Sequence, residues 1–168
     1  MAVSDQTDDG VDAQFRMAMR KFPATVTVVT ANDGIRDHGM TVTAVTSVSM
    51  SPPSLMVCLN NRTLLHEMLL NQARFSVNVL NQEHTETSDA FSGVVPAEER
   101  FNTGDWVRDP SGMMVLKSAL SNIICRRTVA LPYGTHTIFV GEVSHVRVDE
   151  ITHPLLYAEA AYCVSHPA

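Results

Sequence analysis

Basic side chains are scarce in this sequence of 168 residues, which has 12 lysines and arginines against 18 aspartates and glutamates. The formal net charge at pH 7 is therefore −6. A protein that binds nucleic acid needs clustered cations against the phosphates, and the only adjacent basic residues here are Arg20-Lys21 and Arg126-Arg127. We expect no nucleic-acid partner.

Long apolar runs, signal-like segments and cysteine motifs are missing as well. No run reaches about 18 apolar residues, so the sequence predicts no membrane span. Residues 1–10 are acidic and polar and lack the features of a secretory signal, which favours a cytoplasmic protein. Cys58, Cys125 and Cys163 form no C-x-x-C pair, and we predict buried free thiols for the first two, which lie in apolar runs. The histidines show no spacing typical of metal sites, and no metal is expected.

Phosphate-cradle and nucleophile motifs are also absent. The sequence contains no G-x-G-x-x-G, no P-loop and no G-x-S-x-G. Acid and base candidates are few, since Glu98-Glu99 and Asp149-Glu150 fall in expected loops or strand ends. This shortage argues against a hydrolase. It agrees with hydride transfer between two cofactors, for which the protein stacks two rings with reacting atoms about 3–3.5 Å apart.

Strand-like segments dominate what is present. Phe15, Ala18, Met19 and Phe22 recur at helical spacing before Pro23 and predict one N-terminal helix. Strands are predicted over residues 25–30, 39–50, 54–60, 74–80, 123–131, 135–148 and 155–164, and helical patches over 64–70 and 83–91. The pattern indicates a mainly β fold, a barrel with a few peripheral helices. We expect one domain over residues 13–166 behind a flexible N-terminus of residues 1–12.

The segment 39–50 alternates between two kinds of side chain. Its even positions, such as Met40 and Val48, are mostly apolar, whereas its odd positions, such as Thr41 and Thr43, are small and mostly hydroxylic. Alternation places the two sets on opposite faces of a strand. One face then packs in a core, and the other lets a flat isoalloxazine ring approach backbone N–H groups. The same pattern also fits an ordinary strand whose polar face meets water.

The segment Asn60-Asn61-Arg62-Thr63 precedes the apolar helical run over 64–70. Asparagine and threonine are good N-cap residues, and a helix N-terminus accepts phosphate. Arg62 adds a fork-shaped cation. We predict that this turn holds a flavin phosphate, with an ordinary capped helix and a surface arginine as the alternative.

His136, in the segment Tyr133-Gly134-Thr135-His136, is the third candidate. It shares strand parity with Ile138 and Val140, which predicts that its ring points towards the interior near the barrel mouth. A histidine there is able to hydrogen-bond a nicotinamide or a pyrophosphate. The alternative is a rim or core histidine with no role in binding.

In their order and spacing these segments resemble the short-chain NAD(P)H:flavin oxidoreductases, which have a split β-barrel. They are most similar to the reductase components of two-component aromatic hydroxylases of the 4-hydroxyphenylacetate monooxygenase type. The likeness runs from Phe15 to Tyr162. Its pieces are residues 15–19, 26–30, 39–49, 52–58, 75–80, 99–101, 106, 134–136 and 154–157.

The resemblance implies a set of flavin- and nicotinamide-binding residues. The stretch that would meet the isoalloxazine and ribityl chain is Thr41, Val42, Thr43, Ala44, Val45, Thr46 and Ser47. Phosphate contacts would come from Asn60, Asn61 and Thr63, beside Arg62, and further lining would come from Phe75, Asn78, Arg100 and Phe101. His136 would lie beside the nicotinamide as the catalytic residue, with Tyr162 packed nearby.

The resemblance also implies a homodimer with the flavin near its interface, which passes reduced flavin to a partner monooxygenase. An open site for a diffusible flavin favours FAD over FMN, and the lack of a basic cluster for a 2′-phosphate favours NADH over NADPH. Two alternatives stay open. One is a reductase of a corrinoid or ferric chelate that keeps its flavin bound, and the other is a non-enzymatic flavin- or haem-binding module.

Overall fold

A seven-stranded antiparallel sheet forms the body of the protein. The computed structural model describes residues 8–150 and 153–165. Its main sheet has the strand order β3-β2-β6-β9-β10-β5-β4. The strands are β2 (Thr27–Asn32), β3 (Asp37–Val42), β4 (Val45–Met50), β5 (Pro53–Asn60), β6 (Arg74–Val79), β9 (Ser121–Tyr133) and β10 (His136–Val148). The prediction of a mainly β fold is confirmed.

The sheet curls, and a two-residue segment of the chain connects its two edge strands. The edge strands β3 and β4 are consecutive in sequence, and only Thr43 and Ala44 separate them. The chain therefore crosses there from one edge of the sheet to the other, which makes the fold a split barrel. The prediction of one continuous strand over 39–50 is wrong, because a strand cannot pair at both edges without such a break. Its even positions do not share a buried face either, since Val48 and Met50 are 53% and 85% exposed.

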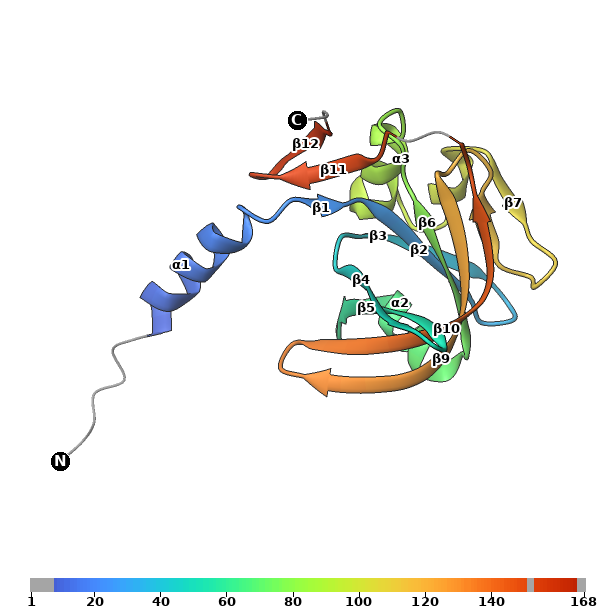
Figure 1. Ribbon diagram of the computed structural model, residues 1–168, viewed down its shortest axis with the longest axis horizontal. Coiled ribbons are helices and arrows are strands. Elements are labelled where there is room, and N and C mark those ends of the chain that lie inside the picture. The colour runs from blue at the N-terminus through green and yellow to red at the C-terminus, as the bar shows by residue number, and fades with distance from the viewer. Residues whose placement is uncertain (1–7, 151–152, 166–168) are drawn as a thin grey trace.

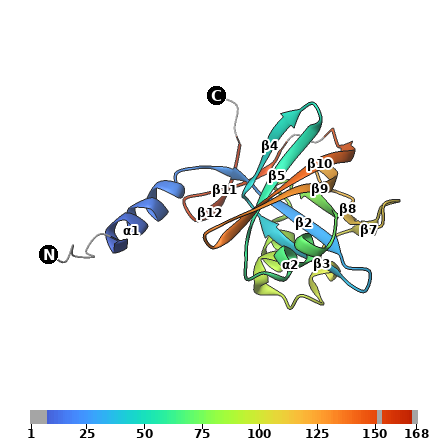
Figure 2. The same ribbon diagram turned by 90° about the horizontal axis from the view of Figure 1, so that it is seen from below.

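Side chains from β5, β6 and β10 fill the barrel interior. Val57, Leu59, Phe75 and Phe139 are all 0% exposed and belong to one core cluster. Close packing here requires a glycine, because a Cβ on Gly141 would lie 2.5 Å from the Phe75 ring. The helix α2 (Leu64–Asn71) lies against the body in Figure 2, where it buries Leu65, Met68 and Leu69 in the same cluster. At these positions the barrel interior is therefore a packed core.

The N-terminal helix α1 (Asp8–Met19) extends away from the body (Figure 1). It ends three residues before Phe22, the last apolar residue of the predicted helical face. The described part of the segment expected to be flexible, from Asp8 onward, is helical, and residues 1–7 lie outside the described ones. Phe15, Met19 and Phe22 stay 62%, 46% and 64% exposed. No helix in the described ranges is long and apolar enough to cross a membrane.

A small second sheet lies beside the point where the edges meet. It joins β1 (Ala24–Thr25) to the hairpin of β11 (Leu155–Ala158) and β12 (Ala161–Val164). The single strand predicted over 155–164 is therefore wrong. Glu159 and Ala160 turn the chain with φ of 51° and 61°. Neither is one of the residue types that usually mark such a turn, so the sequence did not reveal it.

A long connection packs against the main sheet and beside the β11–β12 hairpin. It contains α3 (Thr85–Asp89), the π-helical turn η1 (Ala90–Val94), the 3-10 turn η2 (Arg100–Asn102) and the two-stranded sheet of β7 (Trp106–Arg108) and β8 (Met114–Leu116). Phe91, Phe101 and Trp106 form an aromatic cluster with ring centroids 4.9–5.2 Å apart. This cluster fixes the connection against the sheet. Of the thiols predicted to be buried, Cys125 is buried and Cys58 half-buried, and both are free.

Candidate functional site

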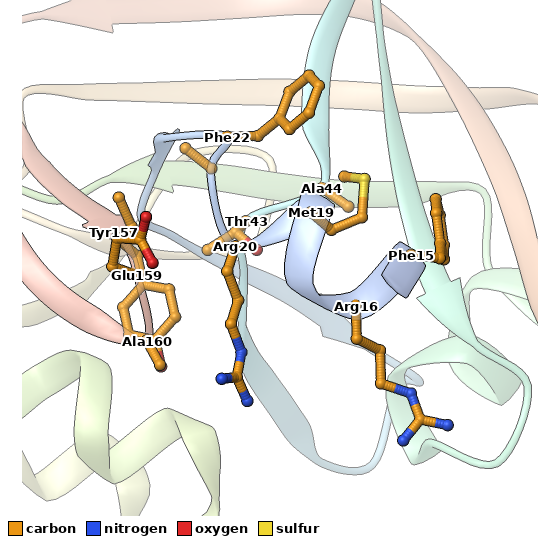
Figure 3. A pocket seen from close by; sticks show the side chains of 12 residues that line it. Phe15, Arg16, Met19, Arg20, Phe22, Thr43, Ala44, Tyr157, Glu159 and Ala160 are labelled. Atoms are coloured by element: carbon orange, nitrogen blue, oxygen red, sulfur yellow. The ribbon is translucent and has the colours of Figure 1, made fainter. Parts of the chain in front are cut away.

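Two clefts flank the crossing at Thr43 and Ala44. The helix cleft, of about 650 Å³, lies between α1, the crossing and the β11–β12 hairpin, as Figure 3 shows. The hairpin cleft, of about 370 Å³, lies between the crossing, α3 and the same hairpin. Thr43, Tyr157 and Ala160 line both clefts. The two clefts therefore form one continuous groove with Thr43 in its middle, of the size that small-molecule sites have.

The crossing presents its main chain to this groove. The side chains of Thr43 and Ala44 are small and exposed. Their carbonyl groups accept hydrogen bonds from Val45 and Cys58, at 3.0 Å each. Neither N–H group donates to any residue that the structure describes. Free amide donors beside small side chains are what a planar heterocycle with acceptor atoms at its edge needs.

The remaining residues predicted around the crossing divide between groove, core and surface. Thr41 lines the hairpin cleft, and its hydroxyl donates to the Ser88 carbonyl at 2.7 Å. Val42 is 5% exposed in the core, and Val45 packs against that core. Thr46 and Ser47 are exposed on β4 and belong to neither cleft. The groove thus takes Thr41, Thr43 and Ala44 from the predicted stretch of 41–47.

Tyr162, which the resemblance places near His136, lies in the hairpin cleft together with Thr43 of the crossing. Its hydroxyl donates to Asp89 at 2.6 Å and contacts the Ser88 hydroxyl at 2.9 Å in the hairpin cleft. Burial and the hydrogen bond to Asp89 raise the pKa of the Tyr162 phenol. The phenol therefore stays protonated and keeps its bond to the carboxylate. Tyr157 packs edge-on against it, with centroids 5.6 Å apart.

The turn before α2 is a capped helix start, as predicted. Thr63 is the N-cap, and its hydroxyl accepts from the His66 backbone N–H at 3.3 Å. Asn60 accepts from the Arg62 backbone N–H at 2.9 Å. The Asn61 amide is engaged at both ends, donating to the Gly134 carbonyl and accepting from the Thr137 hydroxyl. Asn61 is thus committed within the protein, whereas the Arg62 side chain is exposed and available to an anion.

The prediction that His136 points into the barrel is wrong. The inward residues of β10 are Thr137 and Phe139, at 1% and 0% exposure, whereas His136 is exposed. Both faces of this strand carry apolar side chains, so alternation alone did not tell which face was inside. His136 instead lies on the outer face, paired with Asn60 across the β5–β10 ladder. Its Nδ1 is 2.9 Å from the Thr135 hydroxyl.

Four predicted lining residues lie away from the groove. Phe75 and Asn78 are 0% exposed, and Asn78 bonds to Val28, Leu116 and Asn122 inside the protein. Arg100 donates to the carbonyl groups of Val95 and Gly39, and Phe101 belongs to the aromatic cluster. These side chains support the strands and the loop that border the groove. We therefore leave them out of the candidate site.

Several groove residues had not been predicted from the sequence as binding residues. They are Phe15, Arg16, Arg20, Asp89, Ser92, Tyr157 and Ala160. They come from α1, the α3 region and a hairpin turn, which meet only in the folded chain. No spacing within any one of these segments could have revealed them. In the described ranges, no group of three or more His, Cys, Asp or Glu side chains could hold a metal ion.

Comparison with known proteins gives consistent matches over nearly the whole chain. The family model described as "Flavin reductase like domain" matches residues 19–166. The reductase component of an FADH2-dependent resorcinol hydroxylase from Rhizobium sp. is 59% identical over 162 residues, which is 95% of this chain and 90% of that protein. The reductase component of 4-hydroxyphenylacetate 3-monooxygenase from Pseudomonas aeruginosa is 37% identical over 88% of both chains.

The fold matches solved structures equally well. An NADH:FAD oxidoreductase from Streptomyces globisporus, solved with NAD and FAD fragments, superposes with a TM-score of 0.88. It is 28% identical in sequence, and the match covers 98% of each chain.

Proposed function

This chain belongs to the flavin reductase family, and from that premise we propose that it oxidises NADH, reduces free FAD and releases the reduced flavin to a separate hydroxylase. The observation that carries the proposal is the groove at Thr43 and Ala44 with its two unused N–H donors. FAD and NADH are favoured because similar proteins are named for them. Two relatives are named as reductase components for resorcinol and 4-hydroxyphenylacetate, so we propose a partner that hydroxylates a phenol.

The residues of the groove suit an isoalloxazine ring. The small side chains of Thr43 and Ala44 let a flat ring approach the main chain, and their N–H groups supply donors for its acceptor edge. Hydride passes from nicotinamide to flavin when both rings are stacked there. Tyr157, 39% exposed, and the apolar side of α1 shield the ring from water. Arg62 is the cation that we assign to the flavin phosphate.

His136 is the residue that we place beside the nicotinamide. Its ring lies on the outer face of β10, on the same side of the sheet as Asn60 and Cys58. The Cys58 N–H donates to the Ala44 carbonyl, which ties this face to the crossing. We assign Nδ1 as the acceptor of the Thr135 hydroxyl, which leaves the proton on Nε2 for donation to a carboxamide.

A second copy of the chain is the partner that we propose for the outer face of β5, β10 and β9. Cross-strand pairing puts a row of apolar side chains on this face, and they are Met56, Cys58, Val129, Leu131, Ile138 and Val140. Val129 and Leu131 are 47% and 56% exposed. Contiguous exposed apolar surface of this kind marks an interface. His136 and Tyr133 lie at the end of this face, so the second copy in a homodimer would form one side of the proposed site.

The decisive experiment is an assay of the purified protein with NADH and either FAD or FMN. NADH absorbance at a fixed wavelength should fall at a rate that depends on added flavin, and faster with NADH than with NADPH. FAD should have the lower KM of the two flavins. No flavin-dependent NADH oxidation with either flavin would refute the proposed function. A yellow preparation that retained its flavin through purification would contradict the use of flavin as a diffusible substrate.

A further inference from the structure

A chain of hydrogen bonds connects the buried His66 of α2 to the exposed tip of the β9–β10 hairpin. His66 is 8% exposed, and its Nε2 lies 2.9 Å from the Thr137 hydroxyl. That hydroxyl donates to the Asn61 side-chain oxygen at 2.9 Å. Asn61 then donates twice to the hairpin turn, from its side chain to the Gly134 carbonyl at 3.2 Å and from its backbone to the Thr135 carbonyl at 3.0 Å.

The direction of each bond in this chain is determined. Only the NH2 group of Asn61 can donate to the Gly134 carbonyl, so its oxygen must face Thr137. Thr137 donates its single hydroxyl proton to that oxygen, so its own oxygen accepts a hydrogen bond from His66 Nε2. His66 therefore carries its proton on Nε2. Removing any one hydroxyl or amide from such a chain leaves its neighbours without a partner in or near the core.

Apart from the contacts with Asn61, few contacts order the tip of the β9–β10 hairpin. β5 pairs with β10 only as far as His136, opposite Asn60, so the turn lies beyond the last β5 residue. Residues 133–136 are all exposed. Figure 1 shows the ends of β9 and β10 reaching past the body of the barrel. A two-stranded ribbon is only marginally stable by itself, so the contacts from Asn61 decide how well the turn is ordered.

We infer that Thr137 is a positioning residue for nicotinamide binding, which has its hydroxyl oriented by His66 and acts through Asn61 to hold the turn that carries His136. This inference rests on the proposed function, because it takes His136 as the nicotinamide contact. It assigns Asn61 to the support of the hairpin rather than to a flavin phosphate. Loss of the hydrogen-bond chain should therefore weaken NADH binding and leave flavin binding unchanged.

The test is the isosteric variant Thr137→Val, compared with Thr137→Ser. In Thr137→Val we expect the KM for NADH to rise about tenfold, since small misplacements of positioning groups have effects of that order or more. The KM for flavin should stay within about twofold of the parent, well below the tenfold that a direct contact is worth. Amide hydrogen exchange at residues 133–136 should accelerate. Thr137→Ser keeps the hydroxyl and should restore all three values.

Thr30→Val is the matched control. Thr30 and Thr137 are both 1% exposed, and the Thr30 hydroxyl also has two partners, Ser76 and the Met114 carbonyl. Its removal should destabilise the fold to a similar degree, without a change in the KM for NADH or in exchange at 133–136. Should Thr137→Val fail to fold, Asn61→Ala replaces it, because Asn61 is exposed.

The outcomes separate this inference from the proposed function. Unchanged hydrogen exchange at residues 133–136 in Thr137→Val and Asn61→Ala would overturn the inference, whatever the activity. So would equal increases in KM for NADH and flavin, or an increase for flavin alone in Asn61→Ala. Parent protein that does not oxidise NADH would overturn the proposed function, and with it the positioning role of Thr137.

Discussion

His38 is a buried imidazole that no ion pair compensates in the described structure. It is 6% exposed on β3. Burial lowers its pKa to about 4, and the nearby charges of Arg100 and Arg36 add to the effect. At neutral pH the ring is therefore uncharged in the folded chain and mostly uncharged in the unfolded chain, and most of its effect on stability falls in acid.

We predict an acid-dependent loss of stability that belongs to His38. Because its folded pKa lies below the unfolded value of 6.5, the unfolded chain takes up the proton first. The free energy of unfolding should then fall by about 3 kcal/mol between pH 6.5 and pH 4, with no effect of this group above that range. Urea unfolding of the parent and of His38→Asn at several pH values measures it. The same pH slope in both proteins would show that His38 is not responsible.

Residue types alone did not reveal what each polar side chain does. Asn61 and Asn78 were both predicted to meet the flavin, yet both have their side-chain amides engaged inside the protein. Thr63 was predicted as an N-cap, and the structure confirms it. The difference is physical. A cap depends on residues three positions away, whereas the partners of Asn61 and Asn78 come from strands distant in the sequence.

At the scale of elements, the break between β3 and β4 is what forms the groove. Ala44 lies at the crossing with an exposed side chain and a free N–H group. A continuous strand would have used that N–H group in a ladder and left no gap between the two edges.

We predict that Ala44→Trp fills this gap. The indole would occupy the space in the helix cleft next to Thr43, and the dissociation constant for FAD should rise about tenfold or more, in line with the cost of overfilling a packed site. Calorimetric titration with FAD measures the change. Ile35→Trp is the control, since Ile35 is 93% exposed in the β2–β3 turn and should accept the same side chain without effect. Equal affinities in the two variants would move the flavin away from the crossing.

The elements that the sequence predicted well are those with local signals. Strands β5 and β6 and helix α2 begin and end within two residues of the predicted ranges. Two of the errors fall where a tertiary demand interrupts a local pattern, at the crossing and at the turn of Glu159 and Ala160. Both segments keep strand-like residue types through the break, so the sequence favours a strand at positions where the backbone leaves the strand conformation.

At the scale of the whole molecule, the apolar outer face of β5, β10 and β9 is only partly covered by the residues that the structure describes. Leu131, 56% exposed, lies within it. We predict that Leu131→Glu weakens the proposed homodimer about a hundredfold, because a single unpaired charge buried in an interface costs about 3 kcal/mol. Sedimentation velocity over a range of protein concentrations measures it.

The control for this prediction is Val107→Glu. Val107 is 45% exposed on β7, outside the outer face, and the same charge there should leave the assembly intact. A parent protein that sediments as a monomer at micromolar concentration would refute the homodimer.

The sequence by itself determined the mainly β class, most strand positions, the capped start of α2 and, through its ordered motifs, the family. The fold class, the strand positions and the helix start depend on residues within a few positions of one another, and the family depends on the order of motifs along the chain. Only the tertiary structure decided that the chain crosses between sheet edges at Thr43 and Ala44, that His136 faces outward, and that Asn61 supports a hairpin. These features depend on how a seven-stranded sheet curls and which strands become neighbours, and alternation along one strand is the same whichever of its faces is inside.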